Sequence, residues 1–286
     1  MLSRRGLLAS AFAGIGKTRL SALTDEVGVS ERDAVAFCRQ YGLDWVELRN
    51  VPGTKTGYWK LPAKEQREFA GRLRDAGLRV SFVDSGLLAA PLPGTLPVKT
   101  PGAAEGERFV RRMEELDRVL ELAAAVGCKK VRCFGGRRVA DPEGVFGQLA
   151  DVIGPMAEYA GKAGVHLLLE NESSCNVMTC REMALFARLV SSSWFGLNWD
   201  PGNAVRNEKA FPEGYQLLPV AKIGNVQVKG KGIIPGGPDP VDWAGILPAL
   251  ARDGYKGHVG LETHTANRQA DSHPAMQALL RLAVRT

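Results

Sequence analysis

The chain has 286 residues, of which 45% are hydrophobic and 7% aromatic, and its formal net charge at pH 7 is +6. This apolar content is enough to bury a large core, and the length fits either two domains or one large barrel. The basic excess is mild and contains no long basic run, which argues against a nucleic-acid partner, and no apolar stretch reaches the length of a membrane span.

The chain begins MLSRRGLLASAFAGIG, with Arg4 and Arg5 ahead of a short run rich in Ala and Gly. Two arginines, an apolar run and A-x-A sites are the layout of an export signal, here of the twin-arginine kind. We therefore predict a signal segment at residues 1–16 and a periplasmic or otherwise exported bacterial protein, with a cytoplasmic protein as the alternative. Residues 11–18 also match a relaxed phosphate-binding loop, but a strand pattern follows where a helix is needed.

From residue 17 onward one pattern recurs, in which a helical stretch ends in Gly and a short apolar run follows at once. Gly supplies the left-handed conformation that ends a helix, and a run that is apolar on both faces is typical of a parallel strand. The expected helices are 31–41, 63–76, 105–126, 143–163, 179–190, 241–252 and 269–284, with a weak pattern at 204–220. Eight strands alternate with them, so we predict one α/β domain at 17–286, a (β/α)8 TIM barrel. An open doubly wound sheet is the alternative, although no G-x-G-x-x-G follows the first strand.

Acidic or polar residues stand at the ends of the later strands. Glu170 follows VHLLL, Asp200 follows LNW and Glu262 follows HVGL, while Gln227 and Lys229 share one face of the seventh strand. The carboxyl ends of barrel strands meet at one face, so we expect these side chains in the barrel mouth. Three carboxylates and one amide oxygen suit a hard divalent ion, Mn²⁺ or Mg²⁺, with Co²⁺ or Zn²⁺ as alternatives. The expected metal ligands are Glu170, Asp200, Gln227 and Glu262.

The chain resembles the xylose isomerase-like TIM barrels of the sugar phosphate isomerase/epimerase superfamily. The matching motifs are LTDEV, WVELR, LLLEN, LNWDPGN, VQVK and GLE, on strands one, two and five to eight. The resemblance implies the same four metal ligands, with Glu170 and Glu262 as the acid/base pair. Three motifs depart from the usual pattern. Strand seven reads Q-V-K-G in place of H-x-K-D, strand six has Asn203 where His is common, and strand five reads E-N-E in place of E-N-H, which leaves the substrate open.

A metal that binds adjacent carbonyl and hydroxyl oxygens acidifies the C–H beside the carbonyl and stabilises the resulting enediolate. If Glu170 and Glu262 remove and return that proton, the protein is a sugar isomerase or epimerase, and elimination from the same intermediate would make it a lyase or dehydratase. The expected substrate contacts are Glu47, Arg49, Trp59, Asn203, Lys229 and His264. Glu47 and Arg49 stand at alternate positions of strand two and could instead form an ion pair.

Several rival functions use a similar barrel. A metal-dependent endonuclease would need many histidines and a basic groove, but the chain has only four histidines. A glycoside-cleaving enzyme needs paired carboxylates without a metal, and a sugar-binding barrel needs no acid/base pair at all. We expect a keto-sugar or related small hydroxy-carbonyl substrate, no nucleic-acid partner, no membrane span in the mature form, and either a monomer or a homo-oligomer.

Overall fold

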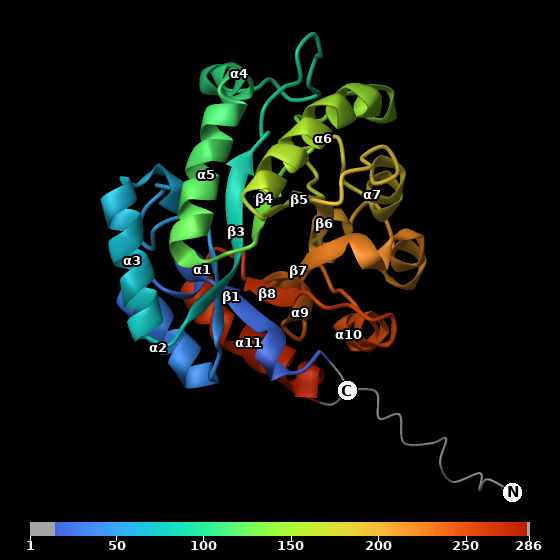
Figure 1. Cartoon of the computed structure of the whole chain (residues 1–286). Helices are drawn as coiled ribbons and strands as arrows, with labels where there is room; N and C mark the ends of the chain where they lie inside the picture. Colours follow the sequence, from blue (N-terminus) through green and yellow to red (C-terminus); the bar gives the residue numbers. More distant parts are fainter. Residues whose placement is uncertain (1–14, 285–286) are drawn as a thin grey trace, which may run out of the picture.

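The computed structural model describes residues 15–284, which form a closed barrel of eight parallel strands in chain order (Figure 1). The barrel closes where β8 pairs with β1. The strands are β1 Leu20–Leu23, β2 Trp45–Leu48, β3 Arg79–Leu87, β4 Lys130–Cys133, β5 His166–Glu170, β6 Phe195–Trp199, β7 Ile223–Lys229 and β8 His258–Glu262. The predicted (β/α)8 barrel is confirmed, and the predicted signal segment at 1–16 lies almost wholly outside the described residues.

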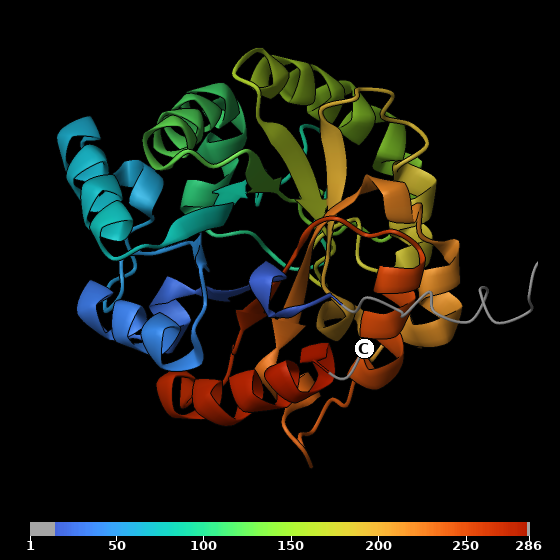
Figure 2. The ribbon, with the colours of Figure 1, turned by 60° about the horizontal axis from the view of Figure 1, so that its bottom comes forward.

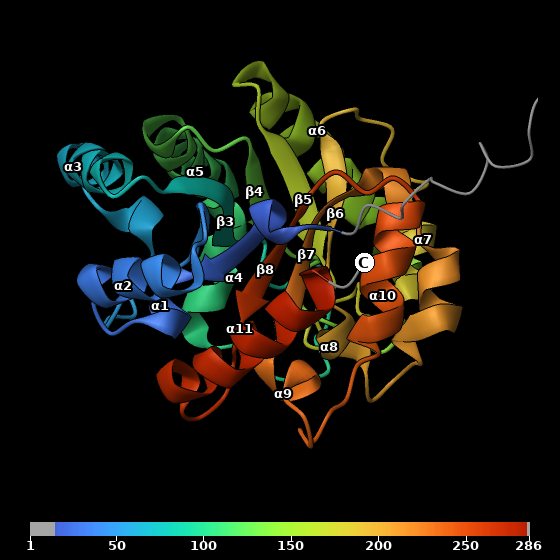
Figure 3. The same cartoon turned by 90° about the horizontal axis from the view of Figure 1, so that it is seen from below.

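Helices surround the barrel and connect its strands (Figure 2). They are α1 Thr24–Val27, α2 Glu31–Tyr41, α3 Ala63–Asp75, α4 Ala103–Val110, α5 Arg112–Val126, α6 Phe146–Lys162, α7 Cys180–Phe186, α8 Pro201–Ala204, α9 Gly230–Ile233, α10 Trp243–Arg252 and α11 Arg268–Val284. The last helix, α11, packs beside α1 where the chain closes on itself (Figure 3). Among the described residues, no helix combines the length and the apolar character needed to cross a membrane.

Local signals explain where these helices begin and end. Ser30 caps α2 by accepting a hydrogen bond from the backbone N–H of Asp33, and α2 ends at Gly42, whose φ of 59° is left-handed. The same kind of glycine, Gly127 with a φ of 69°, ends α5. The predicted helix at 105–126 is two helices, because the backbone leaves the helical region at Arg111. The weak pattern at 204–220 forms only short turns.

The first strand is shorter than the sequence suggested. The apolar run predicts a strand through residue 27, but β1 ends at Leu23 and one turn of helix, α1, follows. This turn carries Asp25 and Glu26 at the carboxyl end of the barrel, with 6% and 1% of their surface exposed. The turn that follows the first strand thus adds two acids to the barrel mouth.

The opposite end of the barrel is filled by apolar and aromatic side chains. A Cβ on Gly196 or on Gly224 would lie 2.7 and 2.8 Å from the Leu168 side chain, which occupies the space that these glycines leave. The rings of Trp45 and His258 pack against each other at a tilt of 59°, with centroids 4.4 Å apart. Lys130 also reaches this end, where its Nζ donates to the Gly224 carbonyl (2.9 Å), while the buried carboxylates gather at the other end.

Candidate active site

Three carboxylates from three strands meet in the barrel mouth. Glu170 ends β5, Asp200 follows β6 and Glu262 ends β8, and one oxygen of each lies within 4.8 Å of the others. Each residue is at most 2% exposed. Oδ1 of Asp200 caps α8 by accepting hydrogen bonds from the backbone N–H groups of Gly202 (2.8 Å) and Asn203 (3.2 Å). Its other oxygen, Oδ2, is buried and faces the cluster, where it forms an ion pair with Lys229.

Lys229 places its ammonium group between two of these acids. Nζ lies 2.7 Å from Glu262 Oε2 and 3.1 Å from Asp200 Oδ2. The strand register explains this position, because Lys229 stands directly opposite Glu262, whereas Gln227 stands opposite Gly260. Lys229, rather than Gln227, is therefore at the level of the carboxylate cluster.

Gln227 lies one level deeper in the barrel than the sequence suggested. Its Nε2 donates to Asp84 Oδ1 (2.7 Å) and Glu47 Oε2 (3.1 Å), and its Oε1 accepts from Asn198 Nδ2 (3.1 Å). Inward-facing side chains two residues apart on a strand occupy successive levels. The amide predicted as the fourth metal ligand is thus bound to a layer of side chains beneath the three carboxylates.

Glu47 is a buried part of that deeper layer and is 0% exposed. It accepts hydrogen bonds from Ser21 Oγ (3.0 Å), Asn225 Nδ2 (3.1 Å) and Gln227. Burial raises its pKa, against the effect of these hydrogen bonds. Glu47 was predicted to contact the substrate, but in the structure its side chain is enclosed by polar groups of the barrel itself.

Arg49 reaches the mouth and pairs with acids of α1 and of the last strand, β8. Its Nη1 lies 2.7 Å from Glu262 Oε1, and its Nη2 lies 2.6 Å from Glu26 Oε1 and 3.1 Å from Asp25 Oδ2. Arg49 therefore does not pair with Glu47, and the alternative prediction of an ion pair between them is wrong. The two side chains point to the same side of β2, but they lie at different depths and have different partners.

Arg132 is a site residue that was not predicted from the sequence. Its Nη1 lies 2.8 Å from Glu170 Oε2 and 3.3 Å from Asp84 Oδ1, and the residue is only 6% exposed. The available signal was a charged residue inside the apolar fourth strand, between Val131 and Cys133. A charge on such a strand must face either solvent or a buried partner, and this one faces the carboxylates.

Two further predicted contacts lie at the rim. Nδ2 of Asn203 donates to Glu170 Oε1 (3.2 Å), so this side chain, at the position where His is common, holds the acid in place. The side chain of His264 is 59% exposed, and its Nδ1 lies 3.6 Å from Glu262 Oε1. His264, Glu26 and Glu262 form a second group whose ligand atoms lie within 4.8 Å of one another.

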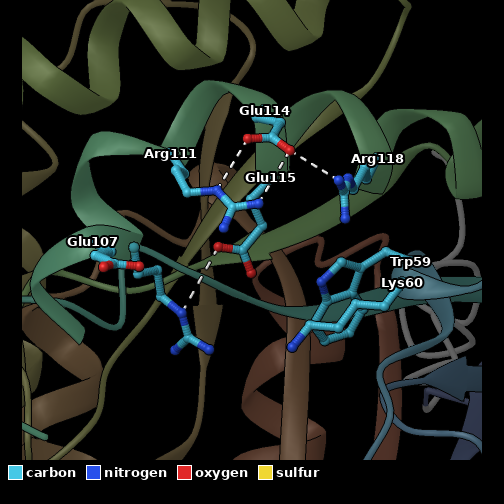
Figure 4. Close-up of a pocket in the computed structure, with 8 residues that line it drawn as sticks. Trp59, Lys60, Glu107, Arg111, Glu114, Glu115 and Arg118 are labelled. Atoms are coloured by element: carbon cyan, nitrogen blue, oxygen red, sulfur yellow. Dashed lines mark hydrogen bonds and ion pairs between the residues drawn. The ribbon is translucent and has the colours of Figure 1, made fainter. Parts of the chain in front are cut away.

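Trp59, predicted as a substrate contact, lines a cavity that is separate from the carboxylate cluster. This cavity has a volume of about 360 Å³, and the other residues that line it are Lys60, Glu107, Arg108, Arg111, Glu114, Glu115 and Arg118. Figure 4 shows the indole next to Lys60 and opposite Glu115 of α5. Trp59 is only 6% exposed, and none of the three clustered carboxylates lines this cavity.

The mouth carries more negative than positive groups. The seven buried acids of this connected network are Asp25, Glu26, Glu47, Asp84, Glu170, Asp200 and Glu262. Its cations are Arg49, Arg132, Lys229 and the half-exposed Arg268, which lies 3.7 Å from Glu26 Oε1. The formal charge is thus −3 when all seven acids and four cations are ionised, which is costly in a buried site unless protons or a metal ion offset it.

The pKa values reflect this imbalance. Burial raises the pKa of Glu170, and it raises that of Asp200 to about 7, although Lys229 acts in the opposite direction. Burial also opposes ionisation of Glu262, but Lys229, a hydrogen bond from His264 and the two arginines outweigh it and hold its pKa well below the usual value. The cluster therefore combines one carboxylate that is strongly stabilised in its ionised form with two that retain protons more readily.

The model of the family described as "Xylose isomerase-like TIM barrel" matches residues 35–283. An L-ribulose 3-epimerase superposes with a TM-score of 0.69 at 21% identity, over 94% of this chain and 96% of its own. A D-allulose 3-epimerase from Methylomonas sp., in complex with D-allulose, gives a TM-score of 0.71 at 17% identity, over 96% and 99%. A xylose isomerase-like TIM barrel protein from Mycobacterium smegmatis, in complex with magnesium, gives a TM-score of 0.68 at 16% identity, over 93% of this chain and 97% of its own. At these identities the likeness shows a shared fold. A search of curated proteins finds no match.

Proposed function

The chain belongs to the xylose isomerase-like TIM barrel family, and from that premise we propose that it is a metal-dependent sugar isomerase or epimerase. The observation that carries the proposal is the meeting of Glu170, Asp200 and Glu262 at the carboxyl ends of β5, β6 and β8. Catalytic groups of (β/α)8 barrels lie at this face, and a divalent ion favours carboxylate ligands.

The residues of the mouth fit a divalent cation in two respects. Asp200 Oδ2 is buried, and the Lys229 ammonium lies 3.1 Å from it, so this oxygen already faces a positive charge. The second is the excess of buried carboxylates, since a divalent cation would offset two of the three net negative charges. Glu170, Asp200 and Glu262 would hold the ion, and when bound it would supply a Lewis acid for the substrate's carbonyl and hydroxyl oxygens.

The two glutamates are suited to moving a proton between substrate carbons. Glu262 is stabilised as a carboxylate, the form needed to remove a proton from the carbon beside a carbonyl. Burial favours the protonated form of Glu170, which is the form that can return a proton. Asn203 and Arg132 orient Glu170 through its two oxygens. Return to the neighbouring carbon would be isomerisation, and return to the opposite face of the same carbon would be epimerisation.

A ketose is the substrate class that we propose. Two proteins of similar fold are a 3-epimerase of L-ribulose and a 3-epimerase of D-allulose, and both named substrates are ketoses. The buried cations Arg132 and Lys229 are placed to accept the negative charge that develops on a ketose oxygen when the adjacent C–H is deprotonated. The metal that supports this reaction is proposed to be Mn²⁺ or Mg²⁺.

The first test is metal content together with solvent proton exchange. Metal in the purified protein would be measured by elemental mass spectrometry, and L-ribulose and D-allulose would be incubated with it in D₂O and followed by NMR. The proposal expects a bound divalent metal and incorporation of deuterium at one carbon-bound position. Glu262→Gln and Glu170→Gln should each lose at least about 1,000-fold of the exchange rate while keeping the native circular dichroism spectrum.

The opposite results would point to a different function. A wild-type protein that holds no metal and takes none up on titration would exclude the metal-dependent reaction. Binding of a sugar without deuterium exchange would then favour a sugar-binding barrel, and release of sugar from a glycoside would favour a glycoside-cleaving enzyme.

We further propose that the protein is exported, on the basis of the arginine pair and the apolar run in residues 1–16. The test is a fusion of these residues to a reporter that is active only in the periplasm. Replacement of Arg4 and Arg5 by Lys should abolish reporter activity, and unchanged activity would contradict a twin-arginine signal.

A further inference from the structure

Lys229 is held firmly inside the carboxylate cluster. Its Nζ joins Glu262 Oε2 at 2.7 Å and Asp200 Oδ2 at 3.1 Å, and the residue is only 4% exposed. Its stem packs against the start of α8, since a Cβ on Gly202 would lie 2.7 Å from Lys229 Cγ. A surface lysine extends its ammonium into water, whereas this one is confined between two strands and a helical turn.

The position of Lys229 also determines which atoms of Glu262 are free. Arg49 Nη1 lies 2.7 Å from Oε1, and Lys229 Nζ lies 2.7 Å from Oε2. Both oxygens of the proposed base are thus engaged by cations. Each oxygen keeps a second lone pair, but the two cations lower the basicity of Glu262 while both contacts persist.

The two acids bridged by Lys229 are also two of the three proposed metal ligands. An ammonium group and a divalent ion cannot occupy the same space between Asp200 and Glu262, and each satisfies the same pair of oxygens. Arg49 differs in this respect, because it contacts Glu262 from the other side and has its remaining partners in Asp25 and Glu26.

We propose that Lys229 is a resident cation that holds the site closed, and that a divalent metal binds only by displacing its ammonium from Asp200 and Glu262. This inference rests on the proposed function, because it concerns the same site. Displacement of Lys229 passes Oδ2 of Asp200 and Oε2 of Glu262 from the ammonium to the ion, so the lysine and the metal compete for the same two atoms. Lys229 acts as a positioning residue that sets the metal affinity of the protein.

The test is Mn²⁺ affinity, measured by calorimetry on metal-stripped protein at one pH, for the wild type, Lys229→Met and Arg49→Met. Both substitutions remove one positive charge that lies 2.7 Å from a Glu262 oxygen. Only Lys229→Met also vacates the space between Glu262 and Asp200. We expect Lys229→Met to bind Mn²⁺ at least about 30-fold more tightly than the wild type, and Arg49→Met no more than about 5-fold more tightly.

A second measurement does not depend on how well Lys229→Met folds. A crystal structure of the wild-type protein grown with Mn²⁺ should show the ion on Asp200 and Glu262 and Lys229 Nζ beyond hydrogen-bond distance of both. An ion on these carboxylates with Lys229 still bridging them would overturn the inference.

The outcomes separate this inference from the proposed function. Equal tightening in both variants would show an effect of charge alone and overturn the inference, as would a wild-type affinity in Lys229→Met. In either case, if the wild type still binds Mn²⁺, the proposed function is not contradicted. Mn²⁺ binding by Lys229→Met alone would support the inference and contradict a metal-dependent reaction in the wild type. No binding by any form would contradict both.

Discussion

Gly260 and Glu47 fit together inside the barrel, because a Cβ at Gly260 would overlap the carboxylate of Glu47. Gly260 stands opposite Gln227 on the neighbouring strand, and Gln227 donates to the same carboxylate. The absence of a side chain on β8 therefore makes room for an acid on β2. This packing supports the polar layer on which the three clustered carboxylates rest.

Gly260→Ala is expected to lower the free energy of unfolding by about 2 kcal/mol, because the added methyl forces Glu47 out of a close-packed layer. The measurement is urea denaturation followed by circular dichroism. Gly147→Ala is the control, since a Cβ there meets nothing within 4 Å on the exposed first turn of α6. We expect the control to be neutral or up to about 1 kcal/mol more stable. Equal effects of the two substitutions would refute this account of Gly260.

Arg132→Met should destabilise the protein by about 3–5 kcal/mol, because it leaves Asp84 and Glu170 buried without their shared cation. Arg132→Lys keeps the charge but loses the fork that also donates to the Asp84 carbonyl. The lysine variant should therefore fall between Met and wild type in urea denaturation. A stability of Arg132→Met close to that of the wild type would show that the carboxylates bear their charge without Arg132.

Asp200→Asn and Glu262→Gln should change stability in opposite directions. Burial raises the pKa of Asp200 to about 7, so its ionised form is unfavourable at pH 8, and an Asn keeps the acceptor that caps α8. Two cations hold Glu262 ionised, and a Gln would lose them. In chelator at pH 8 we expect Asp200→Asn to be more stable by about 1–3 kcal/mol and Glu262→Gln to be less stable by a similar amount. Changes of the same sign would contradict the charge distribution described for the mouth.

His258 should make the protein less stable in mild acid. Burial, with nearby Lys130, Arg19 and Arg79, lowers its pKa to about 4, whereas an unfolded His titrates near 6.5. The unfolded state therefore binds the proton first, so the contribution of His258 is complete above pH 6.5 and is lost as the pH falls toward 4. His258→Gln should reduce the loss of stability between pH 7 and 4 by up to about 3 kcal/mol relative to the wild type. Parallel pH profiles of the two proteins would show that His258 is not the group responsible.

The sequence alone was sufficient for the architecture. Helices that end in Gly and runs that are apolar on both faces are local signals, and their alternation predicts a parallel barrel. The sequence also predicted that Glu170, Asp200 and Glu262 lie together, because the carboxyl ends of the parallel strands in a barrel meet at one face. These conclusions need only the order of the elements and the position of each residue along its strand.

The level of each side chain inside the barrel was decided by the tertiary structure. Gln227 and Lys229 point to the same side of β7, and only the register with β8 shows that Lys229 is opposite Glu262 and Gln227 is opposite Gly260. The partners of Arg132 and Arg49 likewise come from strands distant in the sequence. Register and stagger are set by the closure of the whole barrel, so no local pattern along one strand specifies which side chains share a level.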